Sequence, residues 1–309
     1  MKRRYLQMIP AAVLFLLALG LMLYPIISNW YNQRHQSQIQ TAYHEVLEQT
    51  DTAELERIRE QAVAYNAAIT PGAAEKAYTQ ESIIAASEDY VNQLNIGGSG
   101  IMGYVVIPKI DVDLPIYHGT GSDALDRGTG HLLGSSLPVG GESTHAIITG
   151  HSGMASQKMF TDLEQLREGD VFYLRVLDEV LAYQVDAIHT VLPHDTTFLG
   201  VVPGEDLCTL VTCTPTGINT HRLLVRGTRV PYKPVQEVEN TVLSPEQKVV
   251  SHWEDQYWLG VRLGLVAMIC IVLLFNVVLM LRKQKQAKGT IAERKDRPRK
   301  QKGGRYVRK

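Results

Sequence analysis

The chain contains only three cysteines in 309 residues, namely Cys208, Cys213 and Cys270. Cys270 lies inside a long hydrophobic run. Cys208 stands an odd number of residues before Cys213, so on a regular strand the two thiols face opposite sides of the sheet. No disulfide framework is therefore expected. An unpaired thiol in a domain outside the cell would indicate reactivity.

Signatures of cofactor chemistry are also absent from the sequence. It holds no cluster of metal ligands, no phosphate-binding loop and no dinucleotide-binding fingerprint. We therefore expect neither a metal nor another cofactor. Residues 101–232 contain no internal repeat and no low-complexity segment.

The net charge is close to zero, but the charges are unevenly distributed. Lysine and arginine number 31 in all, and aspartate and glutamate number 32. Positions 2–4 hold 3 basic residues, and residues 282–309 hold 13 basic and 2 acidic ones, which leaves 15 basic and 30 acidic residues in 5–281. Basic tails occur in nucleic-acid-binding proteins, but beside a membrane span they mark the cytoplasmic side. We adopt the second interpretation and expect no nucleic-acid partner.

Two apolar runs are long enough to cross a membrane, at residues 6–27 and 263–281. Trp253, Tyr257 and Trp258 precede the second run as an interfacial aromatic belt would. We interpret the first run as an uncleaved anchor because it exceeds a typical signal-peptide core; a cleaved signal peptide is the alternative. Two spans with basic flanks place both termini in the cytoplasm and the acidic middle region outside the cell membrane.

Residues 30–94 show helical periodicity. Asp51 and Glu54 form the ends of a capping box, and Pro71 with Gly72 ends the helix that follows. A second helix is predicted over residues 83–94. The apolar stripe of the first helix, spaced by threes and fours, comprises Leu55, Ile58, Ala62, Tyr65 and Ile69.

After a glycine cluster at 97–100 the pattern becomes that of strands. Many short strands with few helices predict a closed barrel or a sandwich. One short helix is predicted at residues 161–168. The seven predicted strands cover residues 102–108, 112–118, 145–151, 171–177, 180–191, 207–213 and 223–230.

Two strand-like runs carry the strongest sign of chemistry. Residues 209–215 read TLVTCTP, and residues 219–227 read NTHRLLVRG. Runs joined by so short a loop normally pair antiparallel, so Cys213 and Arg222 are expected to meet at one end of the sheet. A guanidinium can hold such a thiol as thiolate or stabilise the oxyanion formed by its attack. The alternative is a buried structural cysteine, which is the commoner role for a single cysteine.

A histidine suited to this thiol lies upstream. Residues 144–153 read THAIITGHSG, an apolar strand that runs into His151 between two glycines. A thiol, an imidazole and a guanidinium supply the nucleophile, the acid/base and the electrophilic stabiliser of acyl transfer. His118, His131 and His145 are weaker candidates, because none combines a strand end with flanking glycines.

The TLxTC strand, the TGH strand end and the downstream arginine together resemble the sortases. The sequence motif TLVTCTP…NTHRLLVRGTR, followed by a hydrophobic segment, resembles that of the class C sortases, which polymerise pilins. The resemblance covers about residues 103–231 and the flanking membrane segments. It implies a mainly β fold: a closed sortase barrel of about eight strands after an N-terminal helical subdomain, with flanking transmembrane helices.

The resemblance also implies a transpeptidase. Cys213 would attack the threonine–glycine bond of an LPxTG-like signal, and a lysine amine of a pilin subunit would resolve the thioester. His151 would transfer protons, and Arg222 would donate hydrogen bonds to the substrate or the oxyanion. Pilin subunits and the membrane are the implied partners. Substrate-binding or supporting roles fall to Thr149, Thr212 and His221, each of which is equally well an ordinary strand residue.

One departure from the family concerns the lid. Pilin-type sortases usually carry an Asp-Pro-aromatic motif before the barrel, but between residues 67 and 100 the only proline is Pro71, preceded by Thr70. Either a lid is built differently, for example from residues 73–79, or the site is uncovered.

The expected domain organisation follows these boundaries. Residues 1–29 form the start and first anchor, 30–100 the helical or lid region, and 101–232 the catalytic barrel. Residues 233–258 form a linker, 259–281 the second transmembrane helix and 282–309 the basic cytoplasmic tail.

Two alternatives remain open at this point. A membrane-anchored cysteine peptidase would use the same nucleophile with water as acceptor, and products formed with and without an amine would distinguish it. A non-catalytic surface assembly scaffold would tolerate replacement of Cys213.

Overall fold

The structure is a computed structural model that describes residues 2–79, 87–154, 156–234 and 251–295. The chain divides into two compact units. One consists of Met1–Leu23 with Trp258–Lys309, and the other of Tyr24–Tyr257. The second unit contains the sheet and every candidate site residue.

Helices fill the described part of the chain before the sheet: α1 (Lys2–Gln49), α2 (Thr52–Ala68), α3 (Ala73–Thr79) and α4 (Glu88–Asn92). The Asp51 side chain accepts a hydrogen bond from the Ala53 amide at 3.3 Å and so caps α2. The other half of the predicted capping box differs, because the Glu54 carboxylate accepts from the Arg57 guanidinium. Leu55 and Ala62 of the predicted stripe are buried in the core. The second predicted helix overlaps α4, although residues 80–86 lie outside the described residues.

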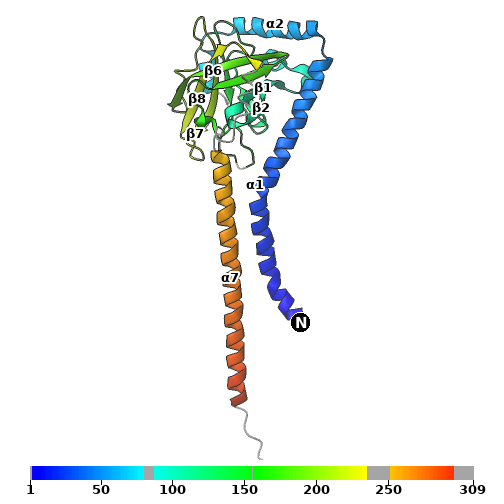
Figure 1. The fold of residues 1–309 in the computed structure, drawn as a ribbon, viewed down its shortest axis with the longest axis vertical. Helices are drawn as coiled ribbons and strands as arrows, with labels where there is room; N and C mark the ends of the chain where they lie inside the picture. Colours follow the sequence, from blue (N-terminus) through cyan, green and yellow to red (C-terminus); the bar gives the residue numbers. More distant parts are fainter. Residues whose placement is uncertain (1, 80–86, 155, 235–250, 296–309) are drawn as a thin grey trace, which may run out of the picture. The chain divides into compact units, whose positions relative to one another are not determined.

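The strands form a closed barrel in the order β1-β2-β3-β4-β7-β8-β6-β5 (Figure 1). This confirms the predicted mainly β architecture. Short helical turns lie between the strands, including α5 (Ser122–Leu125). The strands are β1 (Ile101–Ile107), β2 (Val112–His118), β3 (Thr129–His131), β4 (Thr144–Thr149), β5 (Val171–Val176), β6 (Glu179–Val191), β7 (Asp206–Thr214) and β8 (His221–Val230).

Strand β3 is the one that the sequence pattern did not predict. It is only three residues long, and Gly130 at its centre gives it no side-chain alternation. A Cβ at Gly130 would collide with the Gly119 carbonyl, so close backbone packing requires glycine there. The Thr129 hydroxyl donates to the Pro115 carbonyl at 2.9 Å and fixes the strand against β2.

The helix predicted over residues 161–168 is wrong. The structure has only a short 3₁₀ turn, η3 (Leu163–Gln165), and Leu166 directly after it is already extended. Phe160, Leu163 and Leu166 are all buried in the core. Their spacing of three residues matches a 3₁₀ turn rather than the 3.6-residue period of an α-helix.

Two apolar layers lie on opposite faces of the β4–β7–β8 part of the sheet. Side chains such as Ile148 and Leu210 belong to the main core. On the other face, Val211 packs in a smaller cluster with Ala74 and Ala77 of α3. That smaller cluster also includes Leu132, Ile147, Val191, Leu199 and Leu224. Helix α3 therefore covers the face of β7 that Val211 and Cys213 share, because residues two apart point the same way.

Helix α7 (His252–Lys295) begins in the barrel unit, and its residues from Trp258 onward belong to the other unit. It contains Tyr257–Leu281, which is long and apolar enough to cross a membrane. Its mean hydropathy reaches 2.9. In the described part of α1 the apolar stretch Val13–Tyr24 is too short to count as a membrane span, which needs at least 18 residues. The structure thus supports one apolar helix near the C-terminus and does not support two spans. Helix α7 begins within residues 233–258, where we predicted a linker, and residues 235–250 lie outside the described residues.

Candidate active site

Cys213 and Arg222 lie opposite one another. Strands β7 and β8 pair antiparallel, as predicted, and their register aligns Cys213 with Arg222 and Thr214 with His221. Side chains directly opposite in such a pair leave the same face of the sheet with Cβ atoms about 5 Å apart. The hydrogen-bond register therefore places Cys213 and Arg222 side by side on one face of the sheet.

The guanidinium of Arg222 is oriented by its own loop. Its Nη1 donates to the Asn219 carbonyl at 3.3 Å and to the His221 carbonyl at 3.2 Å. Arg226, four residues later in β8 and on the same face of the strand, instead forms a 2.7 Å ion pair with Asp186. No ion pair to a carboxylate is found for Arg222 within the described residues. Its positive charge is consequently available to a negative group formed at Cys213.

His151 comes to the same end of the sheet from β4. Strands β4 and β7 run parallel, with Thr149 aligned to Val211. The Gly150 amide donates to the Val211 carbonyl at 3.0 Å. The hydroxyl of Ser152 donates to the Cys213 carbonyl at 2.6 Å. These bonds on either side of His151 place it beside the cysteine backbone.

The imidazole of His151 is partly exposed, with 36% of the side chain accessible. Its Nε2 lies 3.7 Å from a carboxylate oxygen of Asp126, just after α5. The backbone is packed closely here, because a Cβ at Gly150 would lie 2.6 Å from the ring of Phe160. The glycine before His151 therefore allows Phe160 to pack directly beneath the strand end.

The three competing histidines occupy different environments. His131 is fully buried, and its Nδ1 and Nε2 lie 2.9 Å from the Tyr90 hydroxyl and the Ser136 carbonyl respectively. Burial lowers the pKa of His131 to about 4. Burial also lowers the pKa of His145, whose two ring nitrogens contact the Gly200 carbonyl and the Thr209 hydroxyl.

His118 also has both ring nitrogens occupied. Its Nδ1 lies 3.1 Å from the Gly100 carbonyl, and its Nε2 lies 2.7 Å from the Gln93 carbonyl. Of the four candidate histidines, His151 is thus the one at the strand end beside Cys213.

The predicted supporting residues differ in their contacts. Thr212 donates from Oγ1 to the Gly150 carbonyl at 2.7 Å and so joins β7 to the residue before His151. Thr149 has a buried Oγ1 that finds no hydrogen-bond partner among the described residues. His221 contacts the neighbouring Thr220 hydroxyl through Nδ1 at 3.0 Å. Only Thr212 thus has a bond that visibly holds the site together.

Sequence reasoning missed Asp126 and Ser152. Strands β3 and β4 and their loops lie between Asp126 and His151 in the chain, so no local spacing signals their contact. Ser152 directly follows His151, and its bond to the Cys213 carbonyl depends on the parallel register of β4 and β7. The adjacency to His151 was the only signal that could have found it.

The two cysteines of β7 also differ sharply. Cys208 is buried in the main core, and burial raises the pKa of its thiol well above the usual value. Cys213 is only partly buried, five residues further along the strand. Both are free thiols, which confirms that they do not bridge one another.

Comparison with known proteins identifies the family. A family profile for the sortase domain matches residues 105–230, which include Cys213, His151 and Arg222. The crystal structure of Streptococcus pneumoniae sortase C is 46% identical, with a TM-score of 0.56, over 63% of this chain and 97% of that one. This chain belongs to the sortase family. A pilus-related sortase C of Group B Streptococcus is 41% identical, with a TM-score of 0.57, over 62% of this chain and 96% of that one.

Among curated proteins, sortase A of Streptococcus agalactiae serotype III is 30% identical over 155 residues. That match spans 49% of this chain and 60% of the length of that relative. The structural neighbours are class C pilin sortases, which agrees with the class indicated by the motifs.

Proposed function

We propose that this chain is a cysteine transpeptidase of pilus assembly. It cleaves an LPxTG-like sorting signal between threonine and glycine and joins the acyl group to a lysine amine of a pilin subunit. The observation that carries the proposal is the convergence of Cys213, Arg222 and the His151 strand end at one edge of the barrel. A nucleophile, an electrophilic stabiliser and an acid/base are what acyl transfer through a thioester needs.

In this mechanism the Cys213 thiolate attacks the threonine carbonyl, and the negative charge moves to the carbonyl oxygen. Arg222 donates hydrogen bonds to that oxyanion or to the substrate backbone. Collapse expels the glycine amine, which takes a proton from His151 and leaves a thioester on Cys213. The incoming lysine amine gives a proton to His151 as it attacks, and the thiolate is restored.

The supporting residues have distinct roles in this proposal. Thr212 holds the backbone before His151 in register with β7 through its bond to the Gly150 carbonyl. Thr149 shares a face with Cys213, and its buried hydroxyl gains a hydrogen-bond partner when substrate binds. His221, opposite Thr214, contacts the substrate at the edge of the site.

Pilin subunits are the proposed partners because the solved sortases most relevant here include one described for its pilin substrate specificity and one described as pilus-related. We place the catalytic domain outside the cell membrane and the basic C-terminal tail in the cytoplasm. The apolar helix within α7 and the 13 basic residues after it support that arrangement. A second anchor at residues 6–27, with the N-terminus also cytoplasmic, remains part of the proposal.

Product analysis tests the reaction type. The full-length protein is incubated with an LPxTG-like peptide, with and without a lysine-bearing pilin peptide, and the products are identified by mass spectrometry. We expect a new amide between the two peptides that disappears in Cys213→Ala. The buried-thiol variant Cys208→Ala is the matched control and should still form it. Hydrolysis alone in the presence of the amine would instead identify a peptidase, and unchanged pilus assembly in Cys213→Ala would identify a scaffold.

A further inference from the structure

The loop that follows His151 is closed by two hydrogen bonds to its own far end. The Phe160 amide donates to the His151 carbonyl at 2.9 Å. The Gly153 amide donates to the Thr161 hydroxyl at 3.0 Å. Phe160 and Thr161 therefore help to hold the backbone of His151 and Gly153 in place, together with the bonds to β7.

Asp162, the next residue, is a buried carboxylate with donors on both oxygens. Only 1% of its surface is accessible. Oδ1 accepts from the side-chain Nε2 of Gln165 at 3.0 Å, and Lys158 Nζ lies 3.2 Å from Oδ2. Oδ2 also accepts a 2.6 Å hydrogen bond from the hydroxyl of Ser251, 89 residues away in the sequence. A carboxylate buried so deeply depends on such donors, because a buried polar group without hydrogen-bond partners lowers the stability of the fold.

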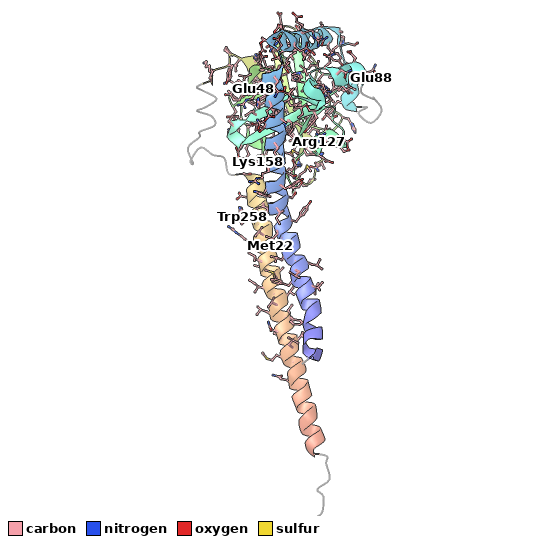
Figure 2. All side chains as sticks on the ribbon, turned by 90° about the vertical axis from the view of Figure 1, so that its right-hand side faces the viewer. Met22, Glu48, Glu88, Arg127, Lys158 and Trp258 are labelled. Atoms are coloured by element: carbon pink, nitrogen blue, oxygen red, sulfur yellow. The ribbon has the colours of Figure 1, made fainter. Side chains whose placement is uncertain are left out.

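Ser251 immediately precedes α7. It is itself buried, with 7% of its surface accessible, and its carbonyl accepts the Asp255 amide at 3.0 Å in the first helical turn. In Figure 2 the labelled Lys158 lies at the end of the barrel where this turn begins. The bond to Asp162 thus fastens the start of α7 to the loop that carries His151.

Two further contacts hold the same loop. The side-chain amide of Asn32, on α1, donates to the Ser156 carbonyl at 3.2 Å. Gln157 donates to the Asp126 carbonyl at 3.0 Å, and the carboxylate of Asp126 is the one beside His151. The parts of α1 and α7 that lie in the barrel unit therefore both contact the loop.

We propose that Ser251 is a positioning residue. Its hydrogen bond to Asp162 connects the first turn of α7 to the loop after His151, and this loop orients the His151 imidazole toward the reacting atoms. This proposal rests on the acid/base role proposed for His151. It predicts that proton transfer depends on a residue at the start of the C-terminal helix, outside the barrel. Because the hydroxyl of Ser251 bonds to Asp162 and acts only through the loop that carries His151, its loss affects turnover rather than substrate binding.

The test compares three variants of the full-length protein in detergent. Ser251→Ala removes the hydroxyl, and Ser251→Thr retains it. Ser143→Ala is the matched control, because Ser143 accepts one hydrogen bond from the Gly204 amide at the opposite end of β4. We expect Ser251→Ala to lower kcat for LPxTG-like peptide cleavage roughly fivefold, with KM within about twofold of the wild-type value. Ser251→Thr should keep most of the wild-type kcat. Ser143→Ala should change neither kcat nor KM appreciably.

Hydrogen exchange measured on the same samples supplies a second readout. Residues 152–162 should exchange faster in Ser251→Ala, while β5 and β6 stay protected and show that the fold is intact. Unchanged kcat or unchanged exchange of this loop in Ser251→Ala, or failure of Ser251→Thr to restore turnover, would overturn the proposal. His151→Ala separates the two ideas. An inactive His151→Ala with a fully active Ser251→Ala rejects only the positioning role, and an active His151→Ala rejects the function on which it rests.

Discussion

Cys213 and Arg222 occupy paired positions on β7 and β8, so the thiol and the guanidinium leave the same face of the sheet. The pairing depends on the register of an antiparallel ladder and therefore on the backbone. Arg222 is further held by the carbonyls of Asn219 and His221. The site thus has its positive charge in place before substrate arrives.

Arg222→Lys should remove most of the activity although it keeps the charge. The planar guanidinium presents several N–H donors in a fixed fork, and the ammonium of lysine cannot reproduce that geometry. We expect kcat/KM to fall more than tenfold, about 1.4 kcal/mol of transition-state stabilisation. Arg226→Lys, which alters the ion pair to Asp186 on the same strand, is the control and should change kcat/KM much less. A loss in Arg222→Lys of less than about tenfold, or no larger than that in Arg226→Lys, would mean that Arg222 acts only as a charge partner or is a solvated strand residue.

Helix α3 should limit access to Cys213. It packs on the sheet face that Val211 and Cys213 share, and Ala77 is buried in that contact. A glutamate there would bury its charge in an apolar cluster, so Ala77→Glu should displace the helix. We expect Cys213 to react with a small thiol reagent roughly tenfold faster in this variant.

Lys76→Ala, on the exposed side of α3, is the control and should leave the rate unchanged. The Ala77→Glu substitution is a better test than a deletion of residues 70–95, because such a deletion would remove Tyr90 and Leu94 from the core. If Cys213 reacts as fast in wild type as in Ala77→Glu, α3 is not a cover and the site is open.

Stability should fall on mild acidification because of His131. Burial lowers its pKa from 6.5 to about 4 in the folded state, so the unfolded chain binds the proton more readily. The stabilisation is present above pH 6.5 and is lost as the pH falls toward about 4, and the lowered pKa of His145 acts in the same direction. Between about pH 7 and pH 5 we expect a loss of about 2 kcal/mol from His131.

Urea unfolding of the soluble barrel region at each pH measures this effect. His131→Asn should flatten the pH dependence, whereas His194→Asn, at an exposed position, should not. The explanation fails if both variants keep the wild-type slope.

The C-terminal tail should lie in the cytoplasm. Its 13 basic residues directly follow the apolar helix, and lysine and arginine near a span set its orientation. Protease added to intact, wall-stripped cells should digest the barrel domain and spare a tag placed after Lys309. A digested tag with a protected barrel would reverse this orientation.

Much of the barrel could be predicted from the sequence because its strands alternate or consist of apolar β-branched runs. Strand β3 was not predicted because it has only three residues and Gly130 at its centre leaves no alternation of side chains. Its position depends instead on contacts with Pro115 and Gly119. The false helix at 161–168 shows the opposite error. The buried residues Phe160, Leu163 and Leu166 recur every three positions, and the chain forms only a 3₁₀ turn there.

The candidate site divides in the same way. Cys213 and Arg222 could be paired from the sequence because a short loop joins their strands. The contacts of Asp126 to His151 and of Ser251 to Asp162 join residues far apart in the chain, and each is made by a side chain on a loop or at a helix end. Such contacts depend on how helices and loops pack against one another in the folded chain, so a local sequence pattern cannot predict them.

The mass of the protein during turnover tests the central claim most directly. The full-length chain is mixed with an LPxTG-like peptide without an amine acceptor, stopped in acid, and analysed intact and after digestion. We expect an added mass equal to the acyl part ending in threonine, attached to the peptide that contains Cys213 and absent in Cys213→Ala. Addition of a lysine-bearing pilin peptide should discharge it. Cleavage that proceeds while Cys213 remains unmodified, or an acyl group attached to Cys208, would contradict the account.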